Sequence, residues 1–457
     1  AAHGGGGKGM RIVHNADTFI SSLESCQREA LNAFGKDRVL LERYIEKPRH
    51  IEFQIFADEH GNTIHLGERE CSAQRRFQKV IEESPSPFLN AELRANMADA
   101  AIQAAKAVNY LNAGTVEFIV SQSGEFFFME INSRLQVEHP VTEMVTGLDL
   151  VKWQIEVAAG LPLPKQQHEI ISQGHAIEVR LYAEDPNKNF MPGSGVIRKL
   201  QLPNANANVR IDSGFREGNL ISVYYDPMLA KLIVHADSRA EALIVMQNAL
   251  AQCQIFGLPS NIRFLELLIA HPKVQAGEID TGFLDQHLDE VLPATNSEPQ
   301  GHRLAAAYFS LQQARQNLTN SDNSNPWSSQ DFWRTHGKGK FRINLKYDQQ
   351  FEPHLIQQSQ STLHVEYNNQ ITRAYILDAT NNQLKIDING QHLSFHSFQF
   401  QDEMIIHDGL NRTHWRILQA GSNAADTEVS VDGFIRSPMP GKLVLIHVNP
   451  GQFVSKG

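Results

Sequence analysis

Alternation of apolar and polar residues over residues 50–55, within the segment 50–58, constrains the fold of this chain more than any other feature. Ile51, Phe53 and Ile55 are apolar, and the residues between them are polar or ionisable. A period of two residues is typical of a strand with one buried face. The turn-forming residues 59–62 and the run TIHLGERE after them predict an antiparallel hairpin.

Other segments extend this pattern into a mixed α and β body over about residues 47–290. The runs GTVEFIV, SQSG and EFFFMEIN predict a second hairpin. Helical periodicity, capping residues or alanine content predict helices at 17–35, 91–108, 141–160 and 238–252. We therefore expect an α+β fold.

The composition changes after residue 290. Residues 291–332 are rich in Asn, Ser and Pro and predict a linker, in which residues 303–316 form one short helix. Many short alternating runs over 333–425 predict a small antiparallel β domain resembling a barrel. Residues 426–457 are strand-rich but have too little apolar sequence for a core of their own.

Overall composition excludes several classes of protein. The chain has 457 residues, with 41 Lys and Arg against 51 Asp and Glu, which gives a net charge of −10. This charge argues against a general nucleic-acid binder, since phosphate backbones attract basic surfaces. Three distant cysteines make no disulfide framework, which favours a reducing compartment. No apolar run is long enough for a membrane helix, and both chain ends look cut.

A glycine loop opens the chain, formed by Gly4, Gly5, Gly6, Gly7, Lys8 and Gly9. Backbone N–H groups of glycines can approach phosphate oxygens closely, and a lysine adds charge. Lys8 is followed by Gly9 rather than Ser or Thr, so this is not a Walker A loop. A phosphate-binding loop and a flexible linker are equally compatible with the sequence.

The second hairpin carries two carboxylates, Glu117 and Glu130. A turn of even length centred on residues 122 and 123 places Glu117 opposite Phe128, with Glu130 as its diagonal neighbour about 7 Å away. Among the phenylalanines around them, two carboxylates need a partner, and Mg²⁺ bound to nucleotide phosphates is a suitable one. A solvated strand face is the alternative.

Polar residues continue at every second position after this hairpin: Glu130, Asn132, Arg134, Gln136 and Glu138. An extended chain would direct all five side chains to one place, where they would supply metal ligands, a fixed cation and a base. A solvated edge strand gives the same alternation, but we favour a site.

Positive charge gathers in a third segment, at Arg75, Arg76 and Lys79. Such a cluster suits an anion such as phosphate or bicarbonate, although single arginines more often form surface ion pairs. Cys71 beside it is more often a small buried hydrophobe than a nucleophile. The 20 His residues show no zinc motif.

These motifs together resemble a known family. GGGGKGMR, EKPRHIEFQI, ERECSAQRRFQKVIEESP, MEINSRLQVEHPVTEMVTGLDLV and GHAIEVRLYAEDP are similar to the biotin carboxylase component of biotin-dependent acyl-CoA carboxylases. SPMPGKLVLIHVNPGQFVSKG resembles the start of a biotinyl carrier domain, and SNPWSSQDFWR most resembles the α subunit of 3-methylcrotonyl-CoA carboxylase. The resemblance implies an ATP-grasp fold lacking its first domain, with residues 1–46 as the rest of the lid.

The family reaction uses ATP and bicarbonate to carboxylate biotin through carboxyphosphate. Carried over by motif, the metal ligands (Mg²⁺ or Mn²⁺) would be Glu117, Glu130 and Asn132. ATP would be bound by Gly4, Gly5, Gly6, Gly7, Met10, Glu42, Arg43, Tyr44, Ile45, His50, Gln74, Lys79, Ile119 and Glu130. Bicarbonate would be held by Arg134, Gln136, the backbone of Val137 and Lys79. Glu138 would be the base, and Arg180 would stabilise the biotin enolate.

The resemblance also implies partners and departures. Residues 333–425 would dock a carboxyltransferase β subunit in an α6β6 assembly, in the bacterial cytoplasm by preference, or in the mitochondrial matrix of a eukaryote. Phe77 stands where the family usually has His or Asn, and the biotin-accepting Lys would lie beyond Gly457. Propionyl-, geranyl- or acetyl-CoA carboxylase, a carbamoyl-phosphate synthetase and a non-catalytic docking fragment are the alternatives.

Overall fold

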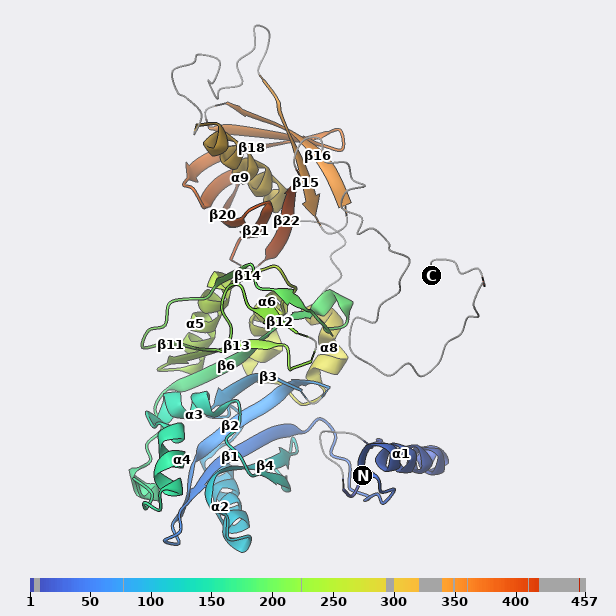
Figure 1. Ribbon diagram of the computed structural model, residues 1–457, viewed down its shortest axis with the longest axis vertical. Helices are drawn as coiled ribbons and strands as arrows, with labels where there is room; N and C mark the ends of the chain where they lie inside the picture. Colours follow the sequence, from blue (N-terminus) through green and yellow to red (C-terminus); the bar gives the residue numbers. More distant parts are fainter. Residues whose placement is uncertain are drawn as a thin grey trace.

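The computed structural model describes residues 1–3, 9–76, 78–222, 224–292, 300–319, 339–347, 350–359, 361–409, 411–418 and 452. Two bodies follow one another along the long axis of the molecule, a mixed α/β body and an all-β body (Figure 1). Within these residues, no helix is both long and apolar enough to cross a bilayer.

An eight-stranded sheet organises the first body, in the order β11-β13-β6-β3-β2-β1-β4-β5 with antiparallel neighbours. Its strands are β1 (Arg49–Ala57), β2 (Thr63–Arg75), β3 (Gln78–Ser84), β4 (Asn112–Val120), β5 (Phe126–Asn132), β6 (His175–Tyr182), β11 (Val209–Ser213) and β13 (Met228–Ala236). Both predicted hairpins are confirmed. The pairing of β3 with β6 joins them to the second half of the body.

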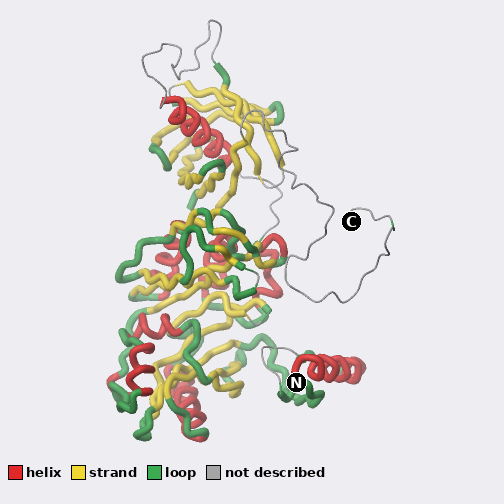
Figure 2. The backbone as a smooth tube through the Cα atoms, in the orientation of Figure 1, coloured by secondary structure: helices red, strands yellow, loops and turns green. Residues whose placement is uncertain are grey.

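Helices lie on both faces of this sheet, whereas the first two in the chain, η1 (Ala16–Thr18) and α1 (Phe19–Phe34), lie beside it (Figure 2). The others are α2 (Ala91–Ala107), α3 (His139–Thr146), α4 (Leu150–Ala158), η2 (Gln167–Glu169), η3 (Pro186–Lys188), α5 (Arg239–Gln252), α6 (Ile262–Ala270), α7 (Pro272–Ala276) and α8 (Phe283–Val291). The single helix expected at 141–160 is two helices. Gly147 ends α3 with φ +69°, and the Asp149 side chain caps α4. Short strands complete the body: β7 (Glu184–Asp185), β8 (Met191–Pro192), β9 (Gly195–Val196), β10 (Lys199–Gln201), β12 (Leu220–Ile221) and β14 (Gln254–Phe256).

Strand β1 is buried along its whole length, which differs from the expected half-buried strand. Ile51 and Phe53 pack against α2 in one apolar core. Phe56, on the opposite face, packs against Trp153 of α4. The polar face of β1 therefore faces the protein interior rather than water, and the candidate site lies there.

The second body is a closed barrel of β15 (Phe341–Tyr347), β16 (Gln350–Ser359), β17 (Thr362–Tyr367), β18 (Gln370–Ala379), β19 (Gln383–Ile388), β20 (Gln391–Phe400), β21 (Glu403–His407) and β22 (Arg412–Leu418). This confirms the predicted antiparallel β domain. Helix α9 (Gln300–Thr319) shares the apolar core of the barrel through Leu304, Phe309 and Leu311. The helix expected within a linker therefore belongs to the barrel.

A buried ion-pair network joins the two bodies. Arg412 of β22 donates to both carboxylate oxygens of Glu266 on α6, at 3.1 and 2.7 Å. The same guanidinium donates to the side chain of Gln254, and His407 lies 3.2 Å from Glu266. Although burial alone would raise the pKa of Glu266, Arg412 and His407 lower it, so this carboxylate stays ionised.

Candidate active site

Lys79, on β3, is the centre of the polar face of the sheet. Its ammonium contacts four side-chain oxygens: Glu52 Oε2 at 2.7 Å, Glu117 Oε1 at 3.3 Å, Gln136 Oε1 at 3.1 Å and Glu138 Oε1 at 2.5 Å. We call these five residues the Lys79 cluster. An ammonium has three N–H donors for these four acceptors, so an incoming anion can replace one of them.

The environment keeps Lys79 charged. Burial alone would lower its pKa, but the carboxylates of Glu52, Glu138 and Glu117 raise it well above the ordinary value. Burial also raises the pKa of the Cys71 thiol, which stays protonated. Cys71 is therefore a buried neutral side chain, as the sequence predicts, and the carboxylates carry the stabilisation of Lys79.

Arg69 is fully buried and contacts the cluster through Glu52. Its Nε donates to Glu52 Oε1 at 2.6 Å. Its other nitrogens donate to Gln54 at 2.8 Å, Thr142 at 3.0 Å and Thr115 at 3.1 Å. The guanidinium thus links β1, β4 and α3 and fixes Glu52 for its contact with Lys79.

Replacing Arg69 is expected to destabilise the body strongly. Arg69→Met leaves the buried Glu52 without its closest partner, a change that costs about 3–5 kcal/mol for a broken buried pair. The matched control is Arg28→Met on the exposed surface of α1, where the Arg28–Glu24 pair spans 3.9 Å, with an expected change within about 0.5 kcal/mol. Urea unfolding followed by circular dichroism compares them; equal free energies of unfolding would refute the structural role of Arg69.

Glu138 and Arg180 form the second part of the site. Glu138 precedes α3, and its Oε2 accepts a 3.0 Å hydrogen bond from Arg180 Nη2. Arg180, on β6, also donates from Nε to Glu82 Oε1 at 2.7 Å. Burial raises the pKa of Glu82, although Arg180 opposes that shift. The guanidinium therefore lies between a deeply buried carboxyl and the proposed base.

His50 and Gln74 lie next to the Lys79 cluster, on the side of Glu117. Gln74 Nε2 donates to the carbonyl of Cys71 at 2.9 Å and contacts His50 Nδ1 at 2.8 Å. In this orientation Nδ1 is the acceptor, so the ring proton is on Nε2, which lies 3.2 Å from Glu117 Oε2. Burial would raise the pKa of Glu117, but His50 and Lys79 lower it far below the ordinary range.

The predicted register of the second hairpin is wrong. Glu117 lies directly opposite Glu130, and Phe118 lies opposite Phe128, with a bulge between the two pairs. The loop spans residues 121–125, an odd number, and the bulge adds a residue on β5. The two carboxylates are therefore direct cross-strand neighbours, whose Cβ atoms stand about 5 Å apart. His50, Glu52 and Glu117 also form a group that could hold a metal ion.

The phenylalanines around these two carboxylates are only in part buried. β5 is the edge strand of the sheet, and Phe127 and Phe128 are 38% and 55% exposed. Of these neighbours, Phe118 on β4 is buried. Glu130 is likewise exposed, which leaves it accessible to a ligand.

The polar residues at every second position over 130–138 do not all point to one place. β5 ends at Asn132, so the chain is not extended through residue 138. Gln136 and Glu138 are buried and reach Lys79, whereas Arg134 is exposed and donates to the carbonyl of Leu135 at 3.4 Å. The structure thus brings two of the five residues into the Lys79 cluster.

The basic residues at 75, 76 and 79 do not face one common site either. Arg75 stacks on the ring of Phe190 at 3.9 Å, and Arg76 donates to Asn189 at 3.1 Å. Both guanidinium groups engage residues 189–190, whereas Lys79 faces the carboxylates. The expected joint anion site of Arg75, Arg76 and Lys79 is therefore wrong.

Six of the residues expected around the nucleotide lie outside the cluster. Met10, Glu42, Arg43 and Tyr44 are exposed, and Ile45 and Ile119 are half-buried. Arg43 lies over the ring of Phe127 at 5.9 Å, so this segment runs beside the edge strand. The glycines at 4–7 and Phe77 are not among the described residues.

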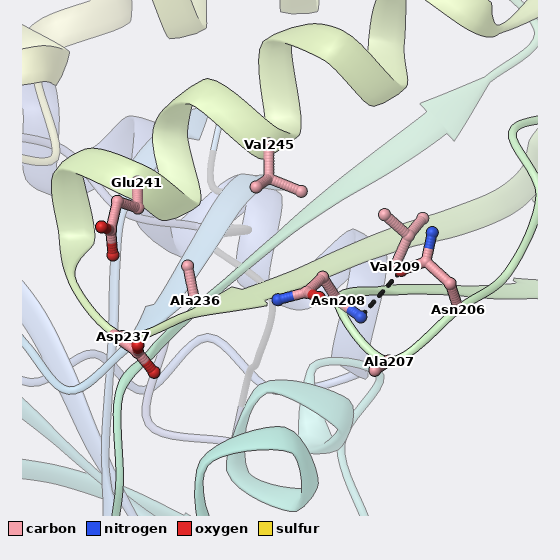
Figure 3. Close-up of a pocket in the computed structure, with 8 residues that line it drawn as sticks. All are labelled: Asn206, Ala207, Asn208, Val209, Ala236, Asp237, Glu241 and Val245. Carbon is pink, nitrogen blue, oxygen red and sulfur yellow. Dashed lines mark hydrogen bonds between the residues drawn. The ribbon is translucent and has the colours of Figure 1, made fainter.

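Sequence reasoning from single residues missed Glu52, Arg69, Glu82 and Lys231. Glu52 stands in the alternating run at 50–58, where ionisable residues indicate either solvent or a buried ion-pair network. The pocket drawn in Figure 3 lies elsewhere, at the end of β13 and the start of α5, with Asn206, Asn208 and Glu241 among its lining residues. No member of the Lys79 cluster lines it.

Comparisons with known proteins agree with this geometry. Residues 1–166 match the family described as carbamoyl-phosphate synthase L chain, ATP binding domain, and residues 178–286 match the biotin carboxylase C-terminal domain. The solved biotin carboxylase domain of Hydrogenobacter thermophilus 2-oxoglutarate carboxylase, in complex with MgADP, ADP and bicarbonate, is 43% identical. It covers 63% of this chain and 63% of its own, with a TM-score of 0.61.

Curated relatives extend the similarity over the whole chain. The Dictyostelium discoideum methylcrotonoyl-CoA carboxylase subunit alpha, mitochondrial, is 42% identical over 100% of this chain and 67% of its own length. The Caenorhabditis elegans propionyl-CoA carboxylase alpha chain, mitochondrial, is 36% identical over 100% of this chain and 66% of its own. The chain spans only about half the length of other methylcrotonoyl relatives. The protein belongs to the family of biotin-dependent carboxylase α subunits and carries the biotin carboxylase fold.

Proposed function

We propose that this chain catalyses the ATP-dependent carboxylation of biotin with bicarbonate. The observation that carries the proposal is the contact of one carboxylate, Glu138, with both Lys79 and Arg180, at 2.5 and 3.0 Å. Two cations hold a base beside the place where an anion would bind. This arrangement suits the deprotonation of an anionic substrate, because the cations stabilise the charge that develops.

Bicarbonate would replace one acceptor of Lys79 and lie against Gln136 and the backbone of Val137. Glu138 would accept its proton, and the freed oxygen would bond to the γ-phosphorus of ATP as ADP leaves. Carboxyphosphate would then split into CO₂ and phosphate, and phosphate would take the ureido proton of biotin. The biotin nitrogen would bond to CO₂ beside Arg180, whose guanidinium stabilises the enolate.

The residues present fit a divalent cation with nucleotide phosphates. Glu117 and Glu130 face each other across the hairpin, and Asn132 follows at the end of β5. Carboxylate and amide oxygens are the ligands that Mg²⁺ and Mn²⁺ prefer. A bound ion would neutralise phosphate charge, and His50 and Lys79 hold Glu117 in its ionised form.

We further propose that the carrier is biotin on a lysine of a biotinyl domain, for which residues 426–457 would be the start. The acyl-CoA would be 3-methylcrotonyl-CoA, because the Dictyostelium relative is the more similar of the two compared over the whole chain. A carboxyltransferase β subunit would dock on the barrel, in an α6β6 assembly, in the mitochondrial matrix or the bacterial cytoplasm. Pairing with candidate β subunits tests the acyl-CoA.

The test uses the subunit at the full length of its relatives and measures bicarbonate-dependent ADP release with and without free biotin. We expect free biotin to stimulate the release of ADP. ATP binding without turnover would favour a non-catalytic docking module. Turnover that biotin leaves unchanged would favour another bicarbonate-using ligase, such as a carbamoyl-phosphate synthetase.

A further inference from the structure

The turn over residues 136–138 has to hold two groups of the site without the support of a strand ladder. It lies between the end of β5 and the start of α3. Gln136 and Glu138 both reach Lys79 from this turn, and the backbone of Val137 lies between them. Its backbone conformation therefore determines where the base and the anion would meet.

Lys231 holds the second half of this turn. It lies on β13, where it is paired in register with Arg180 of β6, and it is 8% exposed. Its ammonium donates to the carbonyl oxygen of Val137 at 2.6 Å and lies 3.3 Å from Asp212 Oδ2. Asp212 is the cross-strand partner of Lys231 on β11. Asp212 thus holds the ammonium of Lys231 in place, and the ammonium in turn holds the carbonyl of Val137.

His139 holds the first half of the turn. Its Nδ1 lies 2.8 Å from the carbonyl oxygen of Gln136, an acceptor, so Nδ1 carries the proton. Burial lowers the pKa of His139, which favours the neutral ring. The carbonyls on both sides of Val137 therefore have fixed directions.

Because peptide groups are planar, fixing the carbonyls of Gln136 and Val137 also fixes the directions of the N–H groups of Val137 and Glu138. In a trans peptide the C=O and N–H groups point in opposite directions. The N–H of Val137 points away from the anchored Gln136 carbonyl, and the N–H of Glu138 points away from Lys231. Over the part of the chain that the structure describes, neither N–H donates a hydrogen bond. Both remain available for an anion beside Lys79.

We infer that Lys231 is a positioning residue for bicarbonate, which fixes the Val137–Glu138 peptide so that the turn presents its N–H groups and the base together. The inference rests on the proposed function. Lys231 touches no reacting atom itself, because its ammonium is engaged by Val137 and Asp212. Its loss is therefore expected to affect the use of bicarbonate more than the use of ATP.

The experiment compares Lys231→Met, Lys231→Gln and Lys231→Arg in the full-length subunit. Lys231→Met and Lys231→Gln are expected to lower kcat/KM for bicarbonate by about 10- to 100-fold, as small misplacements do, with the KM for ATP within about 2-fold of the wild-type value. Lys231→Arg keeps a donor for the Val137 carbonyl and is expected to retain most of the wild-type kcat/KM for bicarbonate. Lys199→Met is the control, since Lys199 pairs with Glu217 on the surface. Asp212 keeps Arg210 as a partner in every variant, at 2.9 and 3.0 Å, which favours folding.

The outcomes separate the inference from the proposed function. A wild-type subunit without bicarbonate-dependent turnover would overturn the proposed function and the inference with it. An active wild type with an unchanged kcat/KM for bicarbonate in folded Lys231→Met or Lys231→Gln would overturn the inference alone. An equal loss for ATP and bicarbonate, or the same loss in Lys231→Arg as in Lys231→Met, would indicate a general structural role and would also overturn it.

Discussion

Glu138→Gln is expected to abolish carboxylation while leaving ATP binding close to normal. The amide keeps the size of the side chain and can still accept from Arg180, but it cannot take a proton from bicarbonate. Losing a general base lowers turnover by about 10²- to 10⁴-fold. Bicarbonate-dependent ADP release measures the loss, and titration with a fluorescent ATP analogue measures binding.

The control for this variant is Glu156→Gln on α4. Glu156 is partly exposed and pairs loosely with Lys152 at 3.7 Å, so the same change of charge is made outside the site. Turnover of this control is expected to match wild type. A comparable loss of ATP affinity and turnover in Glu138→Gln would contradict the assignment of Glu138 as the base.

Arg180→Met is expected to uncouple ATP cleavage from biotin carboxylation. The variant keeps Lys79 beside Glu138 but removes the cation nearest the proposed biotin enolate. Loss of an electrostatic stabiliser of this kind lowers the rate by about 10²- to 10³-fold. The yield of carboxybiotin per ADP is therefore expected to fall, because carboxyphosphate then decomposes without transfer. Parallel assays of ADP and of acid-labile carboxybiotin give the ratio.

Folding is controlled by a double variant. Arg180→Met leaves Glu82, which is fully buried, without its 2.7 Å partner. Glu82→Gln removes that uncompensated charge, so Arg180→Met/Glu82→Gln is expected to recover thermal stability and not the coupling. Recovery of the coupling together with stability would show that Arg180 acts only through folding.

Local periodicity predicts the elements of this fold well. The run at 50–58, the two hairpins and the helices α2 and α5 follow from spacing and capping residues within one segment. The barrel follows from its short alternating runs. These patterns depend on neighbours along the chain, which a single sequence contains.

Register and burial depend on contacts that periodicity does not contain. The odd loop and the bulge of β5 change the partner of Glu117 from Phe128 to Glu130. A period of two also cannot separate a face in water from a face around a buried ion cluster, so Glu52 and Arg69 were missed.

The arrangement of the site depends on contacts between segments that are far apart in the sequence. β3 and β6 place Arg180 beside a turn 42 residues earlier in the chain. Lys231 reaches the same turn across 94 residues. The family resemblance predicts the roles of Arg180 and Glu138, because the family's motifs mark residues that meet in the fold although they are distant in the sequence. Lys231 became apparent only from the carbonyl that it binds.

The transfer of oxygen from bicarbonate to phosphate tests the central claim most directly. When Glu138 deprotonates bicarbonate and the resulting oxygen attacks the γ-phosphorus, cleavage of carboxyphosphate leaves that oxygen in the phosphate. ATP turnover by the full-length subunit with ¹⁸O-labelled bicarbonate is therefore expected to give phosphate with one labelled oxygen, as measured by mass spectrometry. Unlabelled phosphate would mean that water attacks ATP, and would contradict the proposed role of the Lys79 cluster.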